Sequence, residues 1–68
     1  MSNTGAMSVR PELSSMSSAL DDLATRVGAM ADDLADEQRE QLTAALFEVE
    51  RSLRNAQRRL SKLVDDLA

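Results

Sequence analysis

The sequence predicts an all-α fold, an antiparallel two-helix hairpin of the coiled-coil kind. Two runs of apolar residues advance in alternating steps of four and three, the spacing that keeps side chains on one face of a helix. The two runs are mirror images of each other about residue 38, and the segment 36–41 between them contains no apolar residue. A chain of 68 residues is long enough for one domain.

The mirror symmetry matches the two runs residue by residue. The first run comprises Val9, Leu13, Met16, Leu20, Leu23, Val27, Met30 and Leu34. The second run comprises Leu42, Leu46, Val49, Leu53, Ala56, Leu60, Leu63 and Leu67. When the chain folds back at the centre of the mirror, each residue of one run comes level with a residue of the other. Two helices of equal length can then bury their apolar stripes against each other.

The chain begins with a short segment before the first helix. Residues 1–7 are small and mostly polar, and they predict a disordered tail. The first helix is expected from about residue 9 to about residue 35, because Ser8 is a good N-cap and Pro11 then falls in the first turn, where its missing N–H is not needed. The N-terminus lacks the basic and apolar regions of a secretory signal, so the expected location is the cytoplasm.

A turn is expected at about residues 36–38, because the apolar spacing breaks there. Leu34 and Leu42 are eight residues apart rather than seven, and one extra residue rotates the stripe by about 100°. A turn with Asp36 as N-cap resolves this break and starts a second helix at about residue 38, which runs to about residue 67. Two straight helices paired as an antiparallel dimer satisfy the same mirror between chains, so this alternative stays open beside the hairpin.

The residues that flank each stripe are mostly small, whereas two-stranded coiled coils usually carry Glu and Lys at these positions. The small flanking residues include Ser17, Ala19, Ala24, Ala31, Thr43, Ala45 and Ser52. Small flanks widen the apolar face beyond a two-helix seam and let further helices approach. We therefore expect the hairpin to complete a four-helix bundle, either as a homodimer or with helices of another protein. A monomeric hairpin is the alternative.

The apolar stripe supplies most of the predicted protein interface. Phe47, the single aromatic residue, lies outside the stripe and near the turn, where it is either an ordinary exposed side chain or an anchor for a partner. The predicted interface consists of Leu13, Met16, Leu20, Leu23, Val27, Met30, Leu34, Leu42, Leu46, Phe47, Val49, Leu53, Leu60 and Leu63.

The second helix carries basic residues with no acidic residue among them. They are Arg51, Arg54, Arg58, Arg59 and Lys62, and most of them are predicted on the outer face of the helix. Three interpretations are open: a solvated face, a site for an acidic protein partner, or a site for nucleic-acid phosphates. The net charge of −4 and the lack of an aromatic residue among the arginines count against nucleic acid. A nucleic-acid-binding bundle is therefore the alternative function rather than the first.

Several classes of function lack the residues that they need. The chain has no histidine, no cysteine and no glycine-rich phosphate loop, so we expect no enzyme activity, no cofactor, no metal site and no small-molecule substrate. No apolar stretch is long enough to cross a membrane. The expected function is a non-enzymatic helical protein–protein interaction module, such as a small subunit, adaptor or regulator. Its expected partner is itself or another helical protein.

Overall fold

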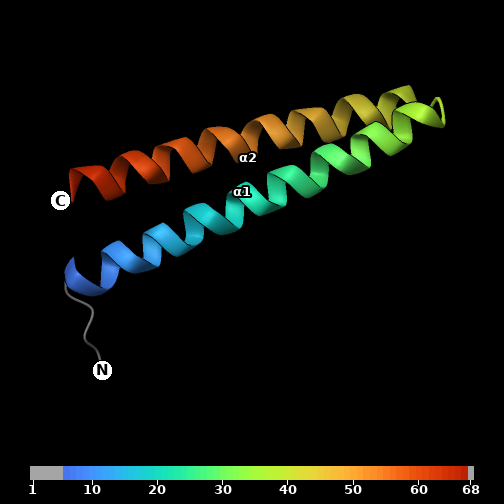
Figure 1. Ribbon diagram of the computed structural model, residues 1–68. Coiled ribbons are helices and arrows are strands. Elements are labelled where there is room, and N and C mark those ends of the chain that lie inside the picture. Colours follow the sequence, from blue (N-terminus) through green and yellow to red (C-terminus); the bar gives the residue numbers. More distant parts are fainter. Residues whose placement is uncertain (1–5, 68) are drawn as a thin grey trace.

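The computed structural model describes residues 6–67 and, among these, the side chains of residues 8–67. It contains two long helices, α1 (Ala6–Asp36) and α2 (Glu40–Asp66). The helices lie side by side in opposite directions, with the turn at one end and the start of α1 and the end of α2 at the other (Figure 1). The predicted hairpin is confirmed, and a single straight helix is excluded. With dimensions of 49 × 22 × 13 Å, the hairpin is one helix thick, so both of its broad sides face solvent.

α1 begins earlier than the sequence predicted. Ala6 and Met7 belong to the helix, so Ser8 lies inside it and is not an N-cap. Pro11 falls in the second turn, where it withholds one backbone hydrogen bond. Alanine and methionine are strong helix formers, which accounts for the extension ahead of Ser8. Of the predicted N-terminal tail, residues 1–5 lie outside the described residues.

α1 ends in a Schellman motif, which sets the direction of the turn. The carbonyl of Leu34 accepts the backbone N–H of Arg39 at 3.1 Å, and the carbonyl of Ala35 accepts that of Gln38 at 3.0 Å. These are the two hydrogen bonds that define the motif, and they require a left-handed residue directly after the cap. Gln38 is that residue, with φ of 60°.

The second helix starts two residues later than expected. The turn occupies residues 37–39, so Asp36 is the last residue of α1 rather than the N-cap of α2. Arg39 takes the N-cap position without a side-chain cap hydrogen bond. Its carbonyl instead accepts both the backbone N–H and the Oγ1 hydroxyl of Thr43, each at 2.9 Å. The Schellman hydrogen bonds account for the later start of α2, because residues 38 and 39 are used to satisfy the last carbonyls of α1.

Replacing Gln38 by glycine should stabilise the hairpin. A left-handed conformation costs an ordinary residue about 1–2 kcal/mol and costs glycine almost nothing. After glycine's larger loss of chain entropy, we expect a gain of up to about 1 kcal/mol and a midpoint of thermal unfolding that is several degrees higher. Circular dichroism melting measures this. Gln41→Gly, inside the first turn of α2, is the control and should lower the midpoint. A lower midpoint for Gln38→Gly would contradict the left-handed turn.

The two helices meet along two rows of residues that repeat every seven positions. The inner row is half-buried and comprises Leu13, Leu20, Val27, Leu34, Leu46, Leu53 and Leu60. The small row is buried and comprises Ser17, Ala24 and Ala31 of α1. Among the described residues, no large side chain is fully buried. The core of the hairpin is therefore thin, and the side chains that are buried among the described residues are those of alanine and serine.

The contact surface of each helix differs from the one that the sequence suggested. The mirror symmetry of the stripe predicts that all of its residues lie between the two helices. In the structure, only the inner row is there, and the helices are turned by about 50° so that the small row completes the contact. The predicted flanks Ser17, Ala24 and Ala31 thus bring the two helices of one chain together. They therefore do not serve the approach of a third or fourth helix, which the sequence favours for them.

Candidate protein-binding surface

The other half of the apolar stripe is exposed. We call it the outer row; Ala56 belongs to it by spacing and is half-buried. The large side chains of the outer row are Val9, Met16, Leu23, Met30, Leu42, Val49 and Leu63. Each of them is between 39% and 50% exposed. A regularly spaced row of this length is unlike the scattered exposed apolar residues of an ordinary surface.

The outer rows of the two helices lie on the same side of the hairpin. In an antiparallel pair of helices, residues that stand at the same sequence offset from the inner row lie on the same side of the hairpin, whichever helix they belong to. Asp21 directly follows Leu20, Arg54 directly follows Leu53, and their side chains touch on what we call the polar side. Every outer-row residue except Leu63 instead precedes an inner-row residue by four, which rotates it to the opposite side, and Leu63 continues the same seven-residue spacing. The hairpin therefore has one polar side and one apolar face, the latter formed by both outer rows.

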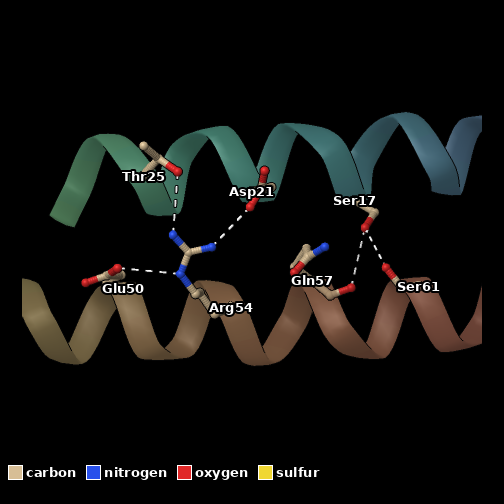
Figure 2. Close-up of polar contacts among 7 residues, drawn as sticks. All are labelled: Ser17, Asp21, Thr25, Glu50, Arg54, Gln57 and Ser61. Atoms are coloured by element: carbon tan, nitrogen blue, oxygen red, sulfur yellow. Dashed lines mark hydrogen bonds and ion pairs between the residues drawn. The ribbon is translucent and has the colours of Figure 1, made fainter. Parts of the chain in front are cut away.

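Arg54 dominates the polar side (Figure 2). Its guanidinium donates to the Asp21 carboxylate at 3.1 Å and to the Thr25 hydroxyl at 3.5 Å, both on α1. Its Nε also lies 3.5 Å from the carboxylate of Glu50, four residues earlier on α2. The position of Arg54 corrects the expectation of an outward-facing residue. Rotation of the helices toward the small row brings this side chain across the contact between them.

A second polar contact lies one to two turns further along α2 (Figure 2). The Ser17 hydroxyl is 3.0 Å from the Ser61 hydroxyl and donates to the carbonyl of Gln57 at 3.4 Å. Nearer the turn, the Glu50 carboxylate lies over Gly28, where an added Cβ would be 3.0 Å from its nearest atom. Small residues on α1 thus let polar side chains of α2 fit closely. These contacts occupy the polar side and connect the two helices there.

The other basic residues of α2 are mostly engaged with their own helix. Arg51 lies 3.3 Å from Glu48, and Lys62 lies 3.8 Å from Asp66. Arg58 donates to the side-chain oxygen of Asn55 at 3.2 Å. Arg59 is exposed. Exposed ion pairs contribute little to stability, but each acidic partner offsets positive charge that a polyanion could otherwise bind. Of the five basic residues, Arg51, Arg54, Arg58 and Lys62 thus have polar partners within the chain.

Phe47 lies near the turn, away from the outer row. It is 40% exposed and lines a shallow hollow of about 420 Å³ with Ala35, Thr43 and Ala44 among others. Like Arg54, it directly follows an inner-row residue, so it belongs to the polar side and not to the apolar face. The sequence left open whether Phe47 is an anchor or an ordinary exposed aromatic. Its position separates it from the rest of the predicted interface.

No protein-family model, curated protein or solved structure matches this chain. Neither helix in the described part of the chain combines the length and the apolarity needed to cross a membrane. Within residues 6–67, potential metal ligands do not gather in a group of three or more. The function proposed below therefore rests on the chain's own residues and their geometry.

Proposed function

We propose that this chain is a non-enzymatic helical interaction module, serving as a small subunit, adaptor or regulator, which binds a helical partner through its apolar face. One observation carries the proposal: the large exposed apolar side chains of the outer row lie on one side of the hairpin. Each still exposes much of its surface, and burying apolar surface contributes roughly 25 cal/mol per Å². A partner that covers this face gains several such contacts at once.

The shape of the apolar face favours helices as the partner. Its side chains repeat every seven residues along two antiparallel helices, and this repeat accepts the side chains of another helix between its own. With both helices of the hairpin exposing such a row, two further helices complete a four-helix bundle. These helices come from a second copy or from another protein. The ion pairs on α2 give no support to the alternative of nucleic-acid binding.

Capture from a cell lysate tests the proposal, with the chain immobilised and the bound proteins identified by mass spectrometry. Met16→Lys places a charge within the apolar face and should reduce capture at least tenfold, because the ammonium group loses its water when the face is covered. Ser18→Lys is the matched control, since it adds the same charge two residues away, toward the outside of the hairpin. It should leave capture unchanged.

Circular dichroism of both variants first establishes that they remain helical. Bound proteins that are helical, or further copies of this chain, are the expected result. Equal capture by wild type and Met16→Lys would show that the apolar face is not the binding surface. Loss of capture for Ser18→Lys alone would place the binding surface on the polar side instead.

A further inference from the structure

We propose that the partner on the apolar face is a second copy of this chain, packed with its turn at the opposite end. This inference rests on the proposed function and names the occupant of the same face. Two hairpins related by a two-fold axis across their long direction form a four-helix bundle. In it, α1 of each copy lies beside α1 of the other, and α2 beside α2, so neighbouring helices remain antiparallel.

The shape of the chain leaves the apolar face uncovered. The hairpin is 49 Å long and one helix thick. Among the described residues, no large side chain is fully buried. Covering the apolar face with one further hairpin would give the chain the burial that its thin core lacks.

The apolar face is complementary to itself when one copy is reversed. The outer row has the same seven-residue spacing on both helices, so a reversed copy again presents large apolar side chains at that spacing to each helix. An isologous interface has to be complementary to itself in this way.

The distribution of charge favours opposed turns over aligned turns. Residues 22–54, the half of the hairpin that contains the turn, carry eight acidic and four basic residues. Residues 8–21 and 55–67, the open half, carry four of each. Aligned turns would concentrate a charge of about −8 at one end of the bundle, whereas opposed turns place each acidic half beside a neutral one. The repulsion acts within a Debye length of about 8–10 Å, the scale of neighbouring helices.

Pulsed electron paramagnetic resonance on a single spin label tests both parts of the proposal. Because the chain has no cysteine, Glu37→Cys gives one labelling site, at the turn. Opposed turns predict a distance between labels of about 50 Å, near the 49 Å length of the hairpin. Aligned turns predict roughly 20 Å, about two helix diameters. Ser18→Cys lies about halfway along the length of the bundle. Its labels should therefore be closer together than about 50 Å in either arrangement, which shows that the labelled chains have paired.

Sedimentation equilibrium on the unlabelled chain completes the test. A dimer, a long Glu37 distance and a short Ser18 distance support the proposal. A short Glu37 distance overturns the opposed arrangement, and a monomer at all concentrations overturns the second copy. A monomer from which Met16→Lys still removes capture of another protein would overturn only this inference and leave the proposed function standing. If Met16→Lys alters neither capture nor self-association, both fail.

Discussion

Replacing Ala24 by leucine should strongly destabilise the hairpin. Ala24 is fully buried at the centre of the small row, between the two helices. A leucine there either forces the helices apart or distorts its neighbours, at a typical cost of about 1–3 kcal/mol. One core in a domain of this size rarely supplies more than about 3–5 kcal/mol. The midpoint of thermal unfolding should fall by about 10 °C or more, measured by circular dichroism.

The control for this prediction is Ala29→Leu in the same helix. Ala29 is exposed, and alanine and leucine have similar helix propensities, so its midpoint should stay within a few degrees of wild type. Equal midpoints for the two variants would mean that the small row does not hold the helices together. The pair separates the effect of added volume at the contact from the effect of added volume anywhere on α1.

Replacing Leu23 by lysine should weaken self-association at least about thirtyfold. Leu23 is the immediate neighbour of Ala24 but points to the apolar face, where it is 42% exposed. Burying the rest of this side chain contributes roughly 1 kcal/mol, and a two-fold dimer contains it twice, so its loss costs about 2 kcal/mol. The lysine adds the cost of removing a charge from water.

The concentration dependence of thermal unfolding measures this effect. The midpoint of the wild-type chain should rise with protein concentration, because association stabilises the folded state by mass action. The midpoint of Leu23→Lys should be nearly independent of concentration over the same range. Ser18→Lys, on the opposite side of α1, should behave as wild type does. A concentration-dependent midpoint for Leu23→Lys equal to that of wild type would rule the apolar face out as the contact between copies.

The hairpin itself could be predicted because its signal is spread over the whole chain. The mirror about residue 38 and the eight-residue step from Leu34 to Leu42 both depend on many residues, and the turn is centred where they place it. The left-handed conformation of Gln38 could not be predicted. That position usually holds glycine, and a glutamine there gives no signal.

The choice between the inner and outer rows was also beyond the sequence. The inner row consists of Leu and Val and the outer row mostly of Leu, Val and Met, so hydrophobicity alone does not say which row faces the other helix. The small row decides it, because Ala24 and Ala31 are fully buried and the leucines next to them on that side are half-buried. Once the helices turn this way, Arg54 comes within reach of Asp21. The seven-residue spacing of Ser17, Ala24 and Ala31 was the available signal for this orientation.

The separation of the rows bears on how the chain can change over evolution. The side chains that close the hairpin and those of the outer row occupy different helical positions, and neighbours such as Leu23 and Ala24 belong to different sets. Mutations in the outer row can therefore accumulate without loss of the fold, while the small row stays under strong constraint. A gene duplication could yield paralogues that share the hairpin and differ in the chain they pair with.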